Sequence, residues 1–163
     1  MRVGTGLDVH PFVPEGPARD GRALVLGGVS IEGAPPLQGW SDADVVAHAV
    51  ADALLGAAHL GDLGTHFPPS KVPRGGSSLD LLAEVGRLIR DAGWRIGNVD
   101  CVVVAQAVRI SPYRERMEQL LSGALAAPGA VSVKATTTDR LGFLGRGEGI
   151  AATAVALLEP AVP

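Results

Sequence analysis

The stretch Ser41-Asp42-Ala43-Asp44-Val45-Val46-Ala47-His48, with its continuation to about Leu60, decides the fold. Ser41 followed three residues later by Asp44 matches a capping box, and acidic residues suit the positive end of a helix dipole. Apolar residues then recur at the spacing of one helix face: Val45, Val46, Ala49, Val50, Ala53, Leu54 and Ala57. The pattern predicts an amphipathic helix that begins near Ser41 and turns this face to the core.

The segments around this helix predict strands alternating with two further helices. Strands are expected over residues 2–10, 23–26, 29–31, 99–107, 131–134 and 150–158, and helices over 77–92 and from Ser111-Pro112 onward. Residues 61–76 form a long, Pro-rich connection, and loops of this length tend to be functional or mobile. We therefore expect one α/β domain, an α+β sandwich over residues 1–163, with about three helices on one face of a mixed sheet.

The last predicted strand is apolar on both of its sides. Ile150, Ala151, Ala152, Ala154, Val155, Ala156 and Leu157 leave almost no alternation. A strand of this kind needs cover on both faces of its sheet. In a chain this short, a second copy of the chain would supply the second cover, so we expect a closed homo-oligomer.

Composition excludes several classes of protein. The net charge of −3 and a pI of about 5.7 leave no basic surplus for a nucleic acid backbone. The single cysteine, Cys101, rules out an internal disulfide framework and lies in an apolar run typical of a core thiol. No apolar run is long enough to span a membrane, and no secretory leader is visible. We expect a cytoplasmic protein that binds neither membrane nor nucleic acid.

Three side chains are candidate metal ligands. Asp8 and His10 are two residues apart on a predicted strand, so both lie on one face, roughly 7 Å apart at the backbone. Such a pair alone is more often structural than functional. His48 on the predicted helix could complete the three protein ligands of a catalytic zinc site. His48 forms a stripe with Asp44 and Asp52. This stripe fits equally a solvated histidine between carboxylates or a ligand whose second ring nitrogen is oriented by an aspartate.

A second polar group follows the strand predicted at 131–134. Thr136, Thr137, Thr138 and Asp139 precede a run of glycines. Hydroxyls beside Gly-rich backbone can donate to phosphate oxygens, and a carboxylate there can hold a hard cation such as Mg²⁺. Taken alone, a threonine run after a strand is more often a turn.

Taken together and in order, these segments resemble the 2-C-methyl-D-erythritol 2,4-cyclodiphosphate synthase family of the non-mevalonate isoprenoid pathway. The motifs that carry the resemblance are residues 6–10 (GLDVH), 41–49 (SDADVVAHA), 52–57 (DALLGA), 61–64 (GDLG), 97–100 (GNVD), 105–107 (AQA), 134–139 (KATTTD) and 141–149 (LGFLGRGEG). They span nearly the whole chain, and their number makes the resemblance specific.

The resemblance implies a lyase that cyclises 4-diphosphocytidyl-2-C-methyl-D-erythritol 2-phosphate and releases CMP. It implies a homotrimer with active sites between subunits. Asp8, His10 and His48 would hold Zn²⁺ or another divalent transition metal, and Asp139 would hold Mg²⁺ or Mn²⁺. Thr137 would stabilise the transition state. Because the substrate's own 2-phosphate is the nucleophile, catalysis would rest on positioning and charge neutralisation.

The resemblance also implies where the substrate binds. Asp62 and Gly64 would contact its methylerythritol portion. The other residues expected to bind the substrate are Asp8, Val9, His10, Trp40, Ser41, Leu63, Phe67, Pro68, Pro69, Ser70, Lys71, Thr136, Thr137, Thr138, Asp139, Phe143 and Arg146. Its cytidine would lie at Ala105, Gln106, Ala107, Val108, Arg109, Ile110 and Ser111. Phe143 and Arg146 match residues that line a central channel of the trimer, which in the family can hold an isoprenoid diphosphate.

Three positions depart from the family pattern. Trp40 stands where the family usually has a histidine that stabilises the transition state. An indole donates one hydrogen bond but carries no positive charge, so that catalytic role does not transfer safely. Pro69, Ser70 and Lys71 replace the usual Asp-Thr-Asp, and Val108 replaces a usual proline. Two alternatives follow: a trimeric metal- and ligand-binding homologue with weak or lost catalysis, or a metal-free α/β assembly protein.

Overall fold

A four-stranded sheet forms the centre of the computed structural model, which describes residues 1–19 and 21–161. Its strand order is β1 (Arg2–Pro11), β6 (Gly149–Pro160), β4 (Trp94–Val104) and β5 (Val131–Thr136). β6 is antiparallel to both neighbours, and β4 is parallel to β5. β1, β4 and β5 therefore run in the same direction, and their carboxyl ends reach one edge of the sheet.

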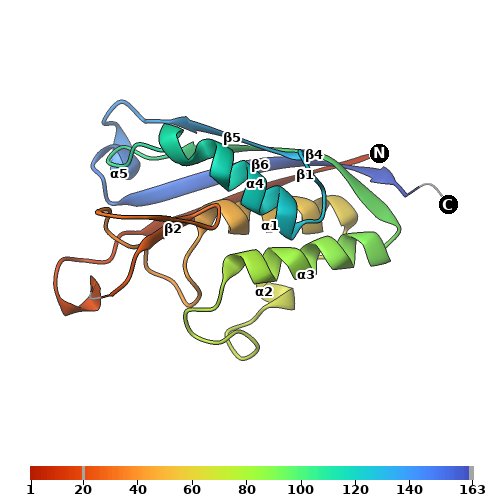
Figure 1. The fold of residues 1–163 in the computed structure, drawn as a ribbon, viewed down its shortest axis with the longest axis horizontal. Coiled ribbons are helices and arrows are strands. Elements are labelled where there is room, and N and C mark those ends of the chain that lie inside the picture. Colours follow the sequence, from red (N-terminus) through yellow and green to blue (C-terminus); the bar gives the residue numbers. More distant parts are fainter. Residues whose placement is uncertain (20, 162–163) are drawn as a thin grey trace.

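Three helices cover one face of this sheet (Figure 1). α1 (Val45–Ala58) packs on β1 and β6, α3 (Ser78–Asp91) on α1 and β4, and α4 (Arg114–Ala124) on β5. Alternate residues of β4, β5 and β6 are buried beneath them. The mixed sheet with three helices on one face is confirmed.

The remaining elements are short. β2 (Leu24–Leu26) and β3 (Val29–Ile31) form a separate antiparallel hairpin. Gly27 and Gly28 link its strands at φ of 55° and 76°, the left-handed geometry that two-residue hairpin turns favour. The two 3₁₀ turns are η1 (Pro17–Arg19) and η2 (Ser111–Tyr113), and the one-turn helices are α2 (Leu63–His66) and α5 (Gly142–Gly145).

The contact between α1 and β1 depends on two glycines. A Cβ added at Gly4 would overlap the carbonyl oxygen of Ala53, and one added at Gly6 would overlap that of Ala49. The two backbones are therefore in direct van der Waals contact, closer than side chains at these positions would allow. The close approach brings the carboxyl end of β1 beside the first turns of α1.

The predicted start of the first helix is wrong by a few residues. The helix begins at Val45, and Asp44 is its N-cap, accepting from the backbone N–H groups of Val46 and Ala47 at 3.0 and 3.2 Å. The same buried carboxylate accepts from the N–H groups of Gly27 and Gly28 at 2.8 and 2.7 Å. The capping-box prediction failed because Asp44 binds the N–H groups of the hairpin turn as well as those of the helix. Spacing along the sequence does not reveal this contact.

Other boundaries show where the pattern was sufficient. The helix predicted over 77–92 is confirmed as α3, with Ser77 as its N-cap. The strand predicted over 99–107 is wrong at both ends, because β4 begins at Trp94 and ends at Val104. A register shift between Ile96 and Asn98 interrupts the alternation at its start. The one-turn helices α2 and α5 were missed because each is too short to show a period.

The helix-free face of the sheet carries exposed apolar side chains. Val3 and Leu7 on β1 are 66% and 67% exposed, and Val155 on β6 is 45% exposed. β1 and β6 are neighbours, so these side chains form one apolar patch, which we call the open face. In the part of the chain that the structure describes, no helix is both long and apolar enough to cross a membrane.

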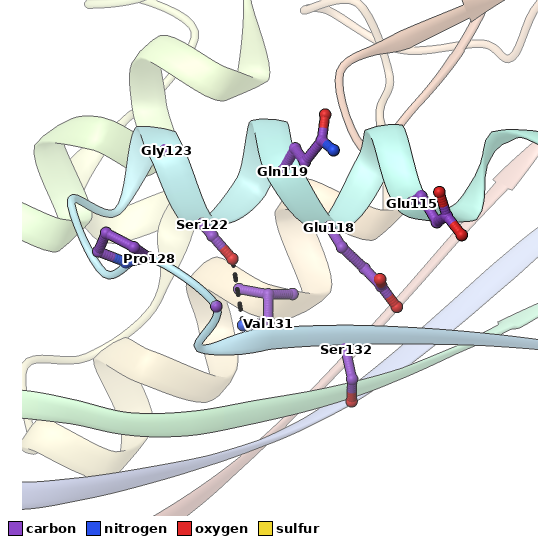
Figure 2. Close-up of a pocket in the computed structure, with 9 residues that line it drawn as sticks. Glu115, Glu118, Gln119, Ser122, Gly123, Pro128, Val131 and Ser132 are labelled. Carbon is purple, nitrogen blue, oxygen red and sulfur yellow. Dashed lines mark hydrogen bonds between the residues drawn. The ribbon is translucent and has the colours of Figure 1, made fainter.

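The free edge of β5 is protected by α4. Ser122 accepts from the Val131 N–H at 3.2 Å, and Glu118 accepts from the Val133 N–H at 2.9 Å. Figure 2 shows Ser122 and Glu118 directed from α4 toward β5, in a groove of about 660 Å³. Because side chains occupy these edge donors, another strand cannot add here without displacing them. The open face is the surface that lacks cover.

Replacement of Gly6 by alanine should destabilise the chain by about 3 kcal/mol, because the added methyl forces α1 away from β1. Urea unfolding followed by circular dichroism measures the effect. Gly56 on α1 has open space around its Cβ position and is the matched control. Gly56→Ala should instead stabilise by up to about 1 kcal/mol through helix propensity. A Gly6→Ala chain as stable as the wild type would contradict the close-contact interpretation.

Candidate metal centre

Asp8, His10 and His48 converge beside the carboxyl end of β1. Asp8 Oδ2 lies 3.1 Å from His10 Nε2 and 2.8 Å from His48 Nδ1. One ligand atom from each residue lies within 4.8 Å of the other two. Adjacent bonds to a tetrahedral zinc would separate such atoms by roughly 3.3 Å. One carboxylate and two imidazoles at these separations fit a divalent transition metal with an open fourth position.

Each imidazole is oriented through its second nitrogen. His10 Nδ1 bonds the carbonyl oxygen of Gln38, which can only accept, so Nδ1 carries a proton and Nε2 faces Asp8. His48 Nε2 lies 2.9 Å from the Ser78 hydroxyl and 3.3 Å from that of Ser41. The Ser78 hydroxyl in turn donates to Asp42. The ring nitrogens that face Asp8 are hydrogen-bonded to its carboxylate, and a metal ion bound there would replace the protons of those bonds.

The predicted orientation of His48 by an aspartate of its own helix is wrong in its residues. Asp44 is occupied by four backbone N–H groups, and Asp52 accepts from the Leu63 N–H at 2.7 Å. An aspartate does act on His48, but it is Asp42, through Ser78. Ser78 comes from the start of α3, thirty residues away, so only the packing of α3 against α1 could reveal it.

The charges of the triad are mutually dependent. Burial alone would raise the pKa of Asp8, but hydrogen bonds from His10 and His48 hold it well below its usual range. The hydrogen bond to Asp8 raises the pKa of His10, against the opposing effect of burial. Asp8 is thus an anion at any physiological pH, as a metal ligand must be.

The triad forms part of the wall of a cavity of about 260 Å³, lined also by Trp40, Ser41, Leu63, Phe67, Pro69, Val72 and Leu81. We call it the metal cavity. Of the loop predicted to contact substrate, Phe67 and Pro69 reach this wall, whereas Pro68, Ser70 and Lys71 are not among its lining residues. Trp40 is 46% exposed, and its indole N–H donates to the Val72 carbonyl at 2.7 Å.

Asp62, Leu63 and Gly64 lie in the turn that opens α2. The Asp62 carboxylate accepts from the backbone N–H and the hydroxyl of Thr65, each at 2.7 Å, and these bonds lower its pKa. Asp52 on α1 fixes the Leu63 N–H. Leu63 is consequently held against the metal cavity, and its neighbours Asp62 and Gly64 are placed beside it. Asp52 is a positioning residue that helical spacing alone misassigned.

The second predicted group lies at the carboxyl ends of β4 and β5. Ala105 N–H donates to the Thr136 carbonyl at 3.0 Å, which places the segment from Ala105 beside Thr136–Asp139. Asp139 has a φ of 52°, its N–H donates to the Thr137 hydroxyl at 3.2 Å, and Thr138 Oγ1 donates to the Leu141 carbonyl. The Gln106 amide oxygen accepts from the Arg140 N–H at 3.1 Å, closing this turn over the strand ends.

Two small cavities flank the segment 105–111. One, of about 400 Å³, is lined by Ala107, Val108 and Arg109 against the chain 31–35, and the other, of about 300 Å³, by Ile110, Ser111 and Lys134. Phe143 and Arg146 lie in and just after α5, where Phe143 is 46% exposed and Arg146 pairs with Glu148 at 2.6 Å. The segment 105–111, which is predicted to bind cytidine, therefore lies beside the threonine run at 136–138.

The two groups do not meet within one chain. β1 and β5 are the outer strands of the sheet, three inter-strand spacings or about 14 Å apart. Both groups lie at the same end of the sheet, because β1, β4 and β5 run in the same direction and both groups are at their carboxyl ends. Among the described residues, the metal-ligating cluster contains Asp8, His10 and His48 but not Asp139.

Fold and site together define an α/β protein with a triad that could hold a metal ion, and a second polar group lies at the same end of its sheet. The YgbB family model matches residues 1–159. The 2-C-methyl-D-erythritol 2,4-cyclodiphosphate synthase of Pelotomaculum thermopropionicum is 56% identical over 160 residues, covering 97% of this chain and 95% of that protein. The synthase of Thermosynechococcus vestitus is 50% identical, with 98% and 96% covered. The chain belongs to the YgbB family.

Solved structures agree with this assignment. IspF of Plasmodium falciparum, in a CDP complex, matches with a TM-score of 0.84 and 33% identity over 99% of this chain and 97% of that one. The bifunctional IspDF of Campylobacter jejuni matches with a TM-score of 0.89 and 35% identity. This chain covers 98% of its own length there but 42% of the bifunctional protein.

Ser78→Ala should weaken metal binding about 10- to 100-fold, because His48 loses the partner that fixes its tautomer. Competition with a chromogenic zinc chelator measures the affinity. The adjacent Ser77 caps α3 without touching the triad and is the matched control. Ser77→Ala should cost about 1 kcal/mol of stability and leave the metal affinity unchanged. Equal metal affinities for the two variants would show that Ser78 does not orient His48.

Proposed function

We infer that this chain cyclises 4-diphosphocytidyl-2-C-methyl-D-erythritol 2-phosphate to 2-C-methyl-D-erythritol 2,4-cyclodiphosphate, with release of CMP. The observation that carries the proposal is the oriented triad of Asp8, His10 and His48 at a cavity, in a chain 56% identical to a synthase of that name. The reaction makes a precursor for isoprenoid biosynthesis. CMP release from the authentic substrate, with Zn²⁺ and Mg²⁺ present, tests it.

The chemistry requires no protein nucleophile. An oxygen of the substrate's 2-phosphate attacks the β-phosphorus, the bond from that phosphorus to the α-phosphate oxygen breaks, and CMP leaves with the electron pair. Zinc held by Asp8, His10 and His48 would supply a Lewis acid that neutralises charge on the β-phosphate. The chain's own task is to hold two anionic groups in line at about 3–3.5 Å, which removes much of the entropic barrier.

The second group of residues would hold the diphosphate and the nucleoside. Thr137 and its neighbours offer hydroxyl donors, and Asp139, in its left-handed turn, offers a carboxylate for Mg²⁺ or Mn²⁺. We assign the cytidine to the cavities beside 105–111, because this segment lies next to the threonine run. CDP is the ligand of the Plasmodium falciparum relative, and we propose that this chain also binds a cytidine nucleotide.

We further propose that the working enzyme is a homotrimer with its active sites between subunits. A substrate diphosphate cannot span the separation of about 14 Å between the triad and the threonine run of one chain. A ring in which the triad of one chain meets Thr137 and Asp139 of the next brings them together. The open face, with Val3, Leu7 and Val155 exposed, supplies apolar surface for that assembly.

Phe143 and Arg146 would lie at the centre of such a ring, and we propose them as the lining of a channel for an isoprenoid diphosphate. Residues 1–163 would act as a single domain, and a cytoplasmic location remains a prediction. The alternative of a binding homologue with lost catalysis is not favoured, because relatives at 50–56% identity over nearly the whole chain are named as synthases.

Mixing two inactive variants tests the shared site. Asp8→Ala and Asp139→Ala should each lose more than 99% of CMP release when alone. Unfolded, mixed in equal amounts and refolded together, they should regain about one quarter of wild-type activity, because one interface in four joins an intact triad to an intact Asp139. Absence of recovery, with mixed trimers shown by mass spectrometry, would place both halves of the site in one chain.

Val155→Lys should break the assembly, because it places a charge in the apolar open face. Sedimentation velocity at micromolar concentration measures the change, with the wild type expected at three chain masses. Ser30, exposed on β3 of the separate hairpin, is the control for adding a charge to a strand. Ser30→Lys should remain trimeric. A wild type that sediments as a stable monomer would overturn the proposed assembly.

A further inference from the structure

A second cavity adjoins the metal cavity on the other side of Trp40. It has a volume of about 510 Å³ and is lined by Arg22, Ala23, Val25, Gly39, Trp40, Ser41, Asp42, Arg74 and Gly75. Trp40 and Ser41 belong to the walls of both cavities. We call it the arginine cavity. Its polar character differs from that of the metal cavity, whose wall contains no Lys or Arg.

The charge of the arginine cavity is positive. Arg22 is held in its wall by donation from Nη2 to the Leu37 carbonyl at 2.9 Å. The Arg74 guanidinium lies over the Trp40 ring, 5.8 Å from its centroid, and pairs with no carboxylate of residues 1–19 or 21–161. Asp42, the acidic residue of the wall, is engaged with the Ser78 hydroxyl and N–H.

Trp40 holds the chain segment that carries Arg74. Its indole N–H donates to the Val72 carbonyl at 2.7 Å, and its own carbonyl accepts from the Gly75 N–H at 2.8 Å. The Asp42 N–H donates to the Gly76 carbonyl at 3.0 Å. These three bonds bracket Arg74 on both sides, and the ring face below it adds a cation–π contact. Arg74 is thereby pre-oriented in the wall of the arginine cavity, against Trp40, which lines both cavities.

We propose that Arg74, held on the Trp40 ring, binds the phosphate monoester of the substrate. The inference rests on the proposed function, because it assigns one substrate group to that same site. The monoester must lie next to the metal-bound diphosphate to attack it, yet the wall of the metal cavity offers it no cationic side chain. A guanidinium matches a phosphate bidentately and stays charged at every working pH. Trp40 then acts as a positioning residue for Arg74 and does not itself donate to the substrate.

Arg74→Gln separates this role from a general effect on binding. The variant should lower kcat/KM for CMP release and weaken calorimetric binding of the authentic substrate by about 10- to 100-fold. CDP lacks the monoester, so its affinity should not change. Arg74→Lys should recover part of the loss, since the charge returns without the planar fork. Arg116→Gln, an exposed arginine on α4 outside both cavities, is the matched control and should behave as wild type.

Two results would overturn the assignment: unchanged substrate affinity and KM in Arg74→Gln, or an equal loss of substrate and CDP affinity. Arg74 is exposed, and circular dichroism of the variant verifies that folding is intact. A wild type that releases no CMP would refute the proposed function instead. The calorimetric comparison of substrate with CDP would still decide whether Arg74 reads the monoester.

Discussion

The direct contact of the α1 backbone with β1 is the constraint on which the rest of the molecule depends. Gly4 and Gly6 remove the side chains that would hold a helix away from a sheet. Asp8 on the strand and His48 on the helix can reach one ion because their backbones lie this close together. His48 comes from the helix, Asp8 from the strand, and the 2.8 Å between their ligand atoms follows from that approach. The metal centre is therefore a product of packing first and of side-chain chemistry second.

Two carboxylates show how the same packing treats charge in opposite ways. Asp44 is fully buried, and burial raises its pKa, yet four backbone N–H groups satisfy it and leave it no further role. Asp8 is only partly buried, and its partners are two imidazoles that could bind the same metal ion beside it. The chain thus uses one aspartate to fasten a hairpin to a helix and another to prepare a cation site. The two aspartates differ in their partners, which are backbone amides for Asp44 and candidate metal ligands for Asp8.

Much of this arrangement could be predicted from the sequence because it follows local periods. Period two placed Asp8 and His10 on one face, and helical spacing placed His48 near a helix start. What could not be predicted came from contacts between distant segments. Ser78 orients His48 across thirty residues, and Asp44 was misread as a capping-box partner because the hairpin that occupies it lies outside any local window. The short helices α2 and α5 lack a period altogether.

Trp40 shows why a departure from a family pattern has to be judged in three dimensions. By residue type, Trp40 lacks the positive charge of the histidine that is usual in the family. However, its ring packs against the Arg74 guanidinium, and its N–H holds the segment that carries Arg74 by donating to the Val72 carbonyl. The positive charge is then supplied by Arg74, which is stacked on Trp40, and Trp40 lines both cavities. The triad is complete within one chain, whereas the threonine run lies three strands away. It follows that metal affinity should be a property of the single chain, while turnover should depend on assembly.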